Sequence, residues 1–249
     1  YGPEIDSDFY KDDYIKMRNK LISNIDIFIC VSNNTKENLI EYYNISTDKI
    51  FVVNHGYNHL ENIETNKSLT KNISDKPFIL YVGGRFKYKN FKLLIEAYCK
   101  NKKIQNNFNI ICYGGEKISK EETNNFRKLG IEKNIIKIDG NDSILKALYL
   151  NSKLLISTSM HEGFGLTILE AISLNCPVIA NDIKVFKEIY KDSIKYYNYN
   201  NLDSLVSQVE EILLKENYRI NKKTLNEILS ENNWEKSVNK TLKIYNLIN

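Results

Sequence analysis

Residues 152–183, SKLLISTSMHEGFGLTILEAISLNCPVIANDI, contain the pattern that decides the fold. The apolar, β-prone run at 153–158 has the length of a strand. Two glycines follow in the loop at 161–165, and residues 166–175 carry apolar side chains at helical spacing. Residues 176–180 form a second apolar run. The stretch therefore predicts a strand, a glycine-containing loop, a helix and a second buried strand.

The junction between this loop and the helix predicts an anion site. The first N–H groups of a helix have no partner inside the helix, and the helix dipole also favours negative charge at that end. Both effects favour a phosphate group. Gly163 and Gly165 let the backbone approach a ligand closely. We therefore expect a phosphate to bind near the amides of residues 165–167.

Two glutamates belong to the same unit, Glu162 in the loop and Glu170 in the helix. Glu170 lies among apolar residues, and a carboxylate that leaves water without partners costs several kcal/mol. It therefore needs hydrogen-bond donors, and the vicinal hydroxyl groups of a ribose would supply two. The alternative is a solvated position on the outer face of the helix. The residues alone leave both interpretations open.

The motif EGFGLTILE at 162–170, followed by EAISLNCPVIA, resembles the donor-site motif of glycosyltransferase family 4 (glycosyl transferases group 1), whose members are retaining enzymes with the GT-B fold. The glutamate spacing, both glycines and Pro177 carry the resemblance. By this resemblance, Glu162 would hold hydroxyl groups of the donor sugar and Glu170 the ribose. His161 is expected to line the pocket. The expected donor-binding residues are Glu170, Gly84, Gly163, Phe164, Gly165, Leu166, Thr167 and His161.

A second glycine turn, GGRFKYKN at 83–90, follows the apolar run at 78–82. Open α/β sheets bind ligands at such carboxyl ends of strands. Arg85 could hold a diphosphate through its planar fork and Lys89 as a point charge. The stretch resembles the family's phosphate-binding loop, although Lys87 is an alternative to Lys89, and a solvated basic turn is an alternative to a site. Arg85, Lys89 and Glu162 form the expected catalytic set.

The organisation of the chain follows from alternating strand-like and helix-like segments across residues 77–215, which predict a doubly wound parallel α/β sheet. By resemblance, residues 77–232 are the Rossmann-like, nucleotide-sugar-binding half of a GT-B protein. Residues 1–58 resemble the remnant of an N-terminal, acceptor-side domain, an incomplete second Rossmann-like domain. The polar residues 59–76 are expected to form a linker or mobile loop. Residues 233–249 are expected to form a helix that returns to the N-terminal domain.

The other elements are expected from periodicity and turn residues. Strands are expected at 25–31, 49–53, 108–113, 135–138 and 195–197. Helices are expected at 11–24, 35–43, 91–103, 119–129, 142–150, 184–190, 202–215, 218–230 and 234–248. In the last helix Trp234, Val238, Leu242 and Tyr245 share one face, and we expect core packing for them. A helix that lacks most of its partner domain would also expose apolar surface.

Composition limits the class of protein. The chain has 249 residues, 42% of them hydrophobic, enough for one large or two small domains. Its net charge of +4 suits a small anionic ligand or loose contact with a membrane's inner face, and argues against a dedicated nucleic-acid binder. The four cysteines form no CxxC pair, which favours buried thiols. We expect no metal and no cofactor. No targeting or spanning segment is recognisable, so a cytoplasmic protein, peripheral at the inner membrane, is expected.

The functional expectation is the transfer of a sugar from a nucleotide-sugar donor to a glycan or lipid-linked acceptor, with retention of anomeric configuration. A hexosyltransferase is expected, with mannose as the favoured sugar and surface polysaccharide or lipopolysaccharide synthesis as the setting. Because the acceptor side resembles only a remnant, we expect this chain alone to bind the donor but to transfer little or no sugar. The alternative is a truncated, non-catalytic nucleotide-sugar-binding module. A weaker alternative is another GT-B enzyme, such as an epimerase or a phosphorylase.

Overall fold

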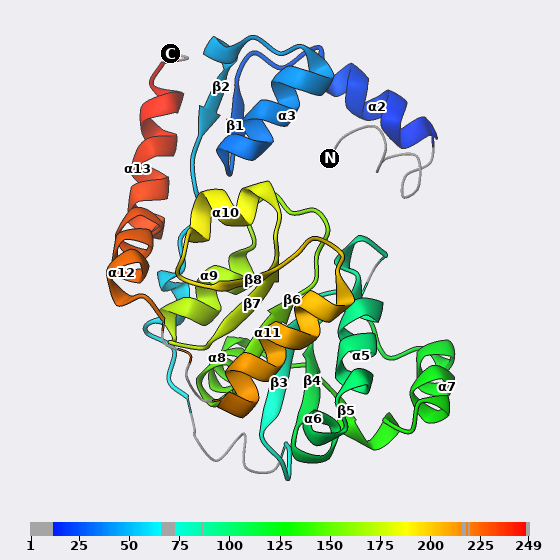
Figure 1. Ribbon diagram of the computed structural model, residues 1–249. Coiled ribbons are helices and arrows are strands. Elements are labelled where there is room, and N and C mark those ends of the chain that lie inside the picture. The colour runs from blue at the N-terminus through cyan, green and yellow to red at the C-terminus, as the bar shows by residue number, and fades with distance from the viewer. Residues whose placement is uncertain (1–11, 66–72, 86, 216–217, 219, 248–249) are drawn as a thin grey trace.

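The computed structural model shows two unequal parts. A large body is built around a six-stranded sheet, and a smaller part contains a two-stranded sheet (Figure 1). The described residues are 12–65, 73–85, 87–215, 218 and 220–247. The expectations for residues 1–11 and for the middle of the linker, residues 66–72, lie outside these ranges.

The six-stranded sheet is parallel throughout, with the strand order β5-β4-β3-β6-β7-β8. Its strands are β3 (Phe78–Val82), β4 (Asn109–Tyr113), β5 (Ile135–Ile138), β6 (Leu154–Ser157), β7 (Val178–Asn181) and β8 (Lys195–Tyr197). The order confirms the predicted doubly wound sheet. Along the chain, β4 and β5 are added on one side of β3. The later strands β6, β7 and β8 are added in turn on its other side. Such a reversal opens a ligand crevice at the carboxyl ends of the two strands that flank it, here β3 and β6.

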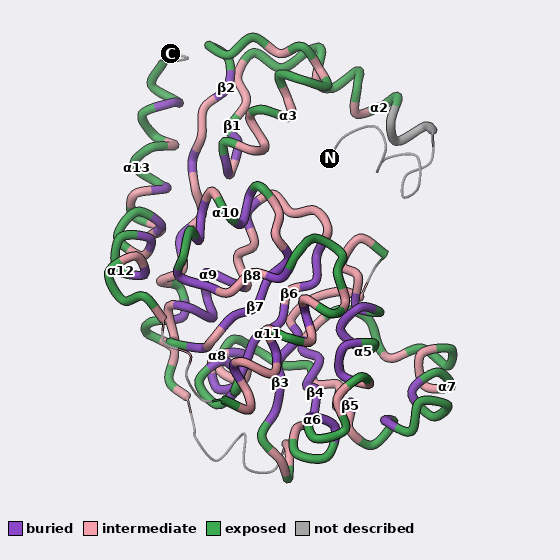
Figure 2. The backbone as a smooth tube through the Cα atoms, in the orientation of Figure 1, coloured by how far each residue is buried: buried purple, intermediate pink, exposed green. Residues whose placement is uncertain are grey.

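Helices cover both faces of this sheet. Phe78 and Leu80 pack on one face, and Ile79 and Tyr81 pack on the other, because side chains alternate along a strand. The first face is covered by α8 (Asp142–Asn151), α9 (Leu166–Ser173), α10 (Lys184–Tyr190) and α12 (Lys222–Glu231). The second is covered by α5 (Phe91–Lys100), α6 (Lys102–Asn107), α7 (Lys120–Lys128) and α11 (Leu202–Lys215). The central strands are consequently buried along their length (Figure 2).

Side-chain caps mark the starts of several helices. Ser119 and Glu122 form a capping box at the start of α7, where the sequence predicted a Ser119 cap. The single helix predicted at 91–103 is wrong, because Asn101 ends α5 and its side chain accepts a hydrogen bond from Ile104 N, which starts α6. Short 3₁₀ turns complete the structure: η1 (Thr47–Lys49), η2 (Asn58–Leu60), η3 (Lys87–Lys89) and η4 (Glu132–Asn134).

The smaller part contains α2 (Asp12–Ile22), β1 (Phe28–Cys30), α3 (Asn33–Tyr43) and β2 (Ile50–Val52). The two strands pair in parallel around α3, and both are shorter than predicted. Ser32 caps α3 by accepting a hydrogen bond from Thr35 N at 3.1 Å, as predicted. This part therefore has one βαβ unit of Rossmann type.

The last helix, α13 (Trp234–Tyr245), packs against the segment that joins the two parts. Trp234 N donates to Asn58 Oδ1 at 2.9 Å, and Ser237 Oγ donates to the carbonyl of Asn54. The two backbones approach so closely that a Cβ on Gly56 would lie 2.1 Å from Trp234 N. The joining segment and the start of α13 are therefore held as one unit.

The predicted core face of α13 is wrong for three of its four residues. Val238, Leu242 and Tyr245 are each 53% exposed, whereas Ser237 and Ile244 face inward. With the backbone of Trp234 against Gly56 and Ser237 bonded to Asn54, the apolar stripe of α13 faces solvent (Figure 2).

Candidate functional site

The strand-order reversal brings Lys89 and Glu162 together. Lys89 ends the turn η3 after β3, and Glu162 lies in the loop after β6. Their side chains form an ion pair that is largely sheltered, with 23% and 16% of the side-chain surface exposed. The two loops are also joined by a hydrogen bond of 2.7 Å from Thr158 Oγ1 to the Lys89 carbonyl. Two residues predicted from separate motifs thus meet in the ligand crevice of the sheet.

A small cavity lies behind this ion pair. Its lining includes Tyr81 of β3, Ser157 of β6, Thr167 of α9 and both members of the pair. The volume, about 10 Å³, holds no more than about one water molecule. A diphosphate therefore has no room at this point until Lys89 and Glu162 separate.

The start of α9 lies beside this cavity. Gly165 precedes the helix with φ +90°, and a Cβ there would lie 2.5 Å from the ring of Phe186. Only glycine fits both conditions without strain. Ile168 N donates to the Gly165 carbonyl at 2.8 Å, whereas the amides of Leu166 and Thr167 precede the first acceptor that a helix provides. The predicted anion-binding end of the helix is thus formed next to Glu162.

Arg85 lies with a different set of partners. Its Nε donates to Glu122 Oε1 at 2.6 Å, and its Nη2 donates to the carbonyls of Glu116 and Lys117 at 2.8 and 3.1 Å. Only 4% of its side chain is exposed, and Nη1 is buried without a hydrogen-bond partner. The guanidinium therefore ties the loop after β3 to the loop after β4. Neighbouring Gly84 accepts a hydrogen bond from Tyr81 Oη at 2.8 Å.

The carboxylate of Glu122 is matched to this guanidinium. Burial alone would raise the pKa of Glu122, but hydrogen bonds from Arg85 and from the N–H of Ser119 lower it below its usual value. The ion pair is therefore formed over the whole neutral range. In this conformation Arg85 and Lys89 contact different carboxylates.

Glu170 is buried, so the solvated alternative for this residue is wrong. Its Oε2 accepts a hydrogen bond from Tyr149 Oη at 2.7 Å, and its Oε1 lies 3.2 Å from His59 Nε2. Burial raises the pKa of Glu170, and the hydrogen bonds from Tyr149 and His59 offset part of that rise. The donors that a buried acid requires thus come from the protein itself.

Sequence reasoning did not identify His59 or Tyr149 as partners of Glu170. The signal for Tyr149 was weak, since an aromatic residue in an amphipathic helix normally indicates core packing. His59 lies 111 positions before Glu170 in the chain, and only the tertiary fold brings it near. The need for donors was predictable, but their identity was not.

The two other histidines lie around Phe164 and Glu162. The ring of His55 packs edge-on against Phe164, with a centroid distance of 5.2 Å, and lies 5.7 Å from the ring of Trp234. Burial lowers the pKa of His55. His161 is half-buried before Glu162; burial lowers its pKa, and the charge of Glu162 opposes the change. His55 therefore packs structurally, and His161 lies beside the predicted pocket.

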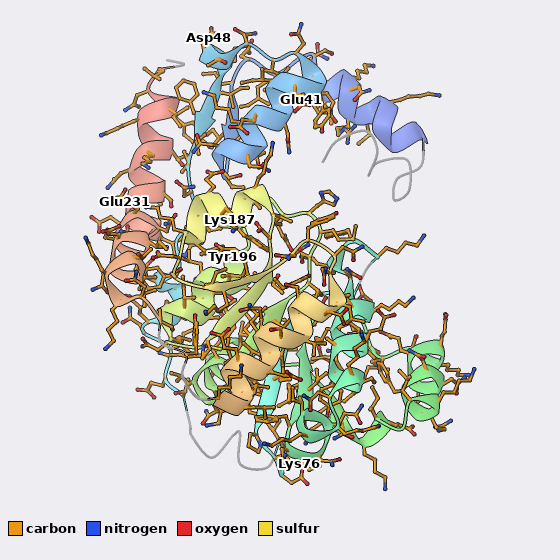
Figure 3. The ribbon with its side chains drawn as sticks, in the orientation of Figure 1. Glu41, Asp48, Lys76, Lys187, Tyr196 and Glu231 are labelled. Atoms are coloured by element: carbon orange, nitrogen blue, oxygen red, sulfur yellow. The ribbon has the colours of Figure 1, made fainter. Side chains whose placement is uncertain are left out.

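A cleft of about 530 Å³ lies between α3 and α10, and Glu188 is one of the polar residues that line it. The Glu188 carboxylate accepts hydrogen bonds from Asn33 N at 2.8 Å and from Asn34 N at 2.9 Å. Ser32 Oγ also donates to the Gly163 carbonyl at 2.7 Å. On the side of the large body, Lys187 lies over the ring of Tyr196 (Figure 3). The smaller part thus contacts the Glu162 loop directly, which the sequence did not predict.

The described part of the chain contains neither a candidate metal centre nor a candidate membrane span. No group of three or more His, Cys, Asp or Glu side chains there is arranged to hold a metal ion. Within the same residues, every helix is too short or too polar to span a bilayer. All four cysteines are free thiols.

Comparisons with solved structures identify the fold. A glycosyltransferase from Rickettsia africae superimposes with a TM-score of 0.76 at 24% identity, covering 96% of this chain and 67% of that one. The Anabaena protein HepE, solved in complex with UDP and glucose, superimposes with a TM-score of 0.68 at 15% identity, covering 90% and 63%. The architecture is therefore that of GT-B glycosyltransferases.

Sequence comparisons identify the family. The O-antigen chain mannosyltransferase RfbU of Salmonella typhimurium is 26% identical over 195 residues, which are 74% of this chain and 50% of the relative. The chain thus spans about half the length of that relative. The profile of the family described as Glycosyl transferases group 1 matches residues 62–232, well over half of the chain. On this match the chain belongs to the group 1 glycosyltransferases, as its two motifs had suggested.

Proposed function

We propose that this chain supplies the donor site of an enzyme that transfers a sugar from a nucleoside-diphosphate donor to a glycan or lipid-linked acceptor. The observation that carries the proposal is the ion pair of Lys89 and Glu162 at the strand-order reversal, beside the free amides of α9. The UDP and glucose bound by HepE, a protein of the same fold, support this class of donor.

Lys89 has the central role in the proposed mechanism. Negative charge builds on the departing nucleoside diphosphate in the transition state, and a fixed cation and helix amides stabilise that charge. When the donor binds, Lys89 exchanges Glu162 for the diphosphate. Glu162 is then free to accept hydrogen bonds from hydroxyl groups of the donor sugar. The amides of Leu166 and Thr167 contact the diphosphate from the other side.

Arg85 is proposed as the second cation, under one condition. Its guanidinium is bound to Glu122, and its unpartnered Nη1 is buried, so it reaches a diphosphate only after the loop that follows β3 moves. Lys89 therefore makes the first contact. Glu170 is proposed to hold the pentose of the nucleotide, and no metal ion is needed, because the two cations and the helix amides neutralise the diphosphate.

The proposed stereochemistry, sugar and product rest on the family. Members of the resembled family retain anomeric configuration, and we propose the same stereochemistry here. The name of the relative RfbU favours a hexose, with mannose first, and a surface polysaccharide as the product. The alternative of a binding module without catalysis is not favoured, because the relatives are named as transferases. Peripheral contact with the membrane where lipid-linked acceptors lie is part of the proposal.

The proposal is tested by calorimetry against UDP, GDP and their sugar esters. We expect one site per chain, with tighter binding of the diphosphates than of the matching nucleosides. Failure of all these compounds to bind would contradict the proposed donor site.

A further inference from the structure

Both carboxylate oxygens of Glu170 already have partners in the protein. Tyr149, from α8, donates to Oε2, and His59, from the turn η2, contacts Oε1. These are the positions that hydroxyl groups of a pentose would need. The two partners differ in accessibility: Tyr149 is 1% exposed, whereas 32% of the His59 side chain is exposed. His59 is therefore the partner that a ligand can replace.

The other ring nitrogen of His59 fixes the direction of the hydrogen bonds. Trp234 Nε1 lies 3.3 Å from His59 Nδ1, and an indole N–H can only donate. Nδ1 must therefore accept, which leaves the proton of the neutral imidazole on Nε2, facing Glu170. The indole N–H, the imidazole and the carboxylate form a continuous series from the first residue of α13 to α9.

Trp234 is linked to the Glu162 loop through the ring of His55. His55 lies between Trp234 and Phe164, with ring centroids 5.7 and 5.2 Å from them. Trp234 N also donates to Asn58, the residue before His59. A displacement of His59 therefore acts on Trp234, which contacts η2 directly and the Glu162 loop through His55.

We propose that His59 occupies the place of a pentose hydroxyl group on Glu170, and that binding of a nucleoside diphosphate replaces its imidazole and releases Trp234. This inference rests on the proposed donor site. It makes His59 a positioning residue that competes with the ligand, and it links occupation of the site to the start of α13. A 2′,3′-dideoxy nucleotide cannot make the exchange, because it lacks the hydroxyl groups.

The test uses the fluorescence of Trp234, the only tryptophan in the chain. UDP and GDP are titrated against the protein, each beside its 2′,3′-dideoxy counterpart, with calorimetry on the same samples. We expect the emission of Trp234 to shift with the ribonucleotide, with the midpoint that calorimetry gives. The dideoxy nucleotide is expected to bind about tenfold more weakly and to leave the emission unchanged.

Substitution of His59 tests whether this residue competes with the nucleotide for Glu170 or supports nucleotide binding. His59→Ala removes the competing partner, so we expect ribonucleotide binding to tighten severalfold and the emission response to disappear. Glu61→Ala is the matched control, an exposed position two residues later, and is expected to behave as the unsubstituted protein. Melting of both variants checks that they are folded.

The outcomes distinguish this inference from the proposed function. Binding of a ribonucleotide without a change in Trp234 emission, or weaker binding by His59→Ala, overturns the exchange and leaves the donor site intact. Equal binding of ribo- and dideoxynucleotides also overturns it. Failure of both UDP and GDP to bind overturns the donor site and the exchange together.

Discussion

The ammonium group of Lys89 and the carboxylate of Glu162 form an ion pair across the point where the strand order reverses. Each comes from the carboxyl end of one of the two central strands, β3 and β6. In a sheet of this kind that point is the ligand crevice. The pair therefore occupies the proposed diphosphate site with the protein's own charges, and a donor must separate it to bind.

Lys89→Ala is expected to weaken binding of nucleoside diphosphates about 10- to 100-fold, the effect of losing one hydrogen bond between charged groups. Binding of free nucleosides should not change, because they carry no phosphate. Lys87→Ala is the control, since Lys87 is exposed two residues earlier. Calorimetry measures both. An equal loss of affinity for nucleosides and for diphosphates would show that Lys89 does not contact the diphosphate.

Glu122→Ala is expected to destabilise the protein by about 3 kcal/mol, because it leaves the buried Arg85 guanidinium without its carboxylate. Arg85→Met should cost less, since Glu122 is 28% exposed and can be hydrated. Urea unfolding gives both values. Glu121→Ala, at an exposed neighbouring position, should change the free energy of unfolding by less than about 0.5 kcal/mol. If Glu122→Ala falls within that same limit, the ion pair is not structural.

Gly56→Ala is expected to destabilise the protein by about 3 kcal/mol, because its Cβ would overlap the backbone of Trp234. Gly130→Ala is the matched control: Gly130 has φ +69° and open space around it, so it should cost about 1 kcal/mol from backbone strain alone. Thermal unfolding compares the two. A smaller loss at Gly56 than at Gly130 would show that α13 is not held against the joining segment.

The variant Glu170→Gln tests, through the pH dependence of stability, whether Glu170 is a buried ionisable carboxyl. The pKa of Glu170 is raised by burial above its ordinary value of 4.5, with His59, Tyr149 and Asp142 as the titratable groups around it. A raised pKa contributes stability below the unfolded value, and that contribution is lost as pH rises through the folded value. Glutamine stays neutral at every pH, so the variant should gain stability relative to the unsubstituted protein as pH rises above about 4.

The measurement for Glu170→Gln is the free energy of unfolding of both proteins at each pH. His59 contacts the same carboxylate, so His59→Ala is combined with Glu170→Gln to separate the two groups. A difference that stays constant with pH, or that favours the unsubstituted protein as pH rises, would contradict burial of an ionisable carboxyl at this position.

Much of the large body was predictable from sequence. The bounds predicted for β3, β5, β8, α10 and α11 match the structure. These segments have clear apolar periodicity or turn residues at their ends, which are local signals. The sequence also predicted Lys89 and Glu162 as candidate site residues, because each follows a strand and belongs to a family motif. The strand order then brings them together.

Relationships between distant segments were not predictable. Contacts with Asn54, Gly56 and Asn58 hold the start of α13, and its apolar stripe faces solvent. Glu188 caps α3 from a position 155 residues away. Arg85 was expected to face a ligand, but Glu122 and two loop carbonyls bind it in this structure. In each case the contact is made by a residue of another element, so the local sequence pattern could not predict it.

The most direct test of the account is a crystal structure of this protein with UDP or GDP bound. We expect the pair of Lys89 and Glu162 to be separated, with a phosphate oxygen within about 3 Å of Lys89 Nζ and beside the first amides of α9. A nucleotide bound elsewhere, with the Lys89–Glu162 pair intact, would contradict the central claim.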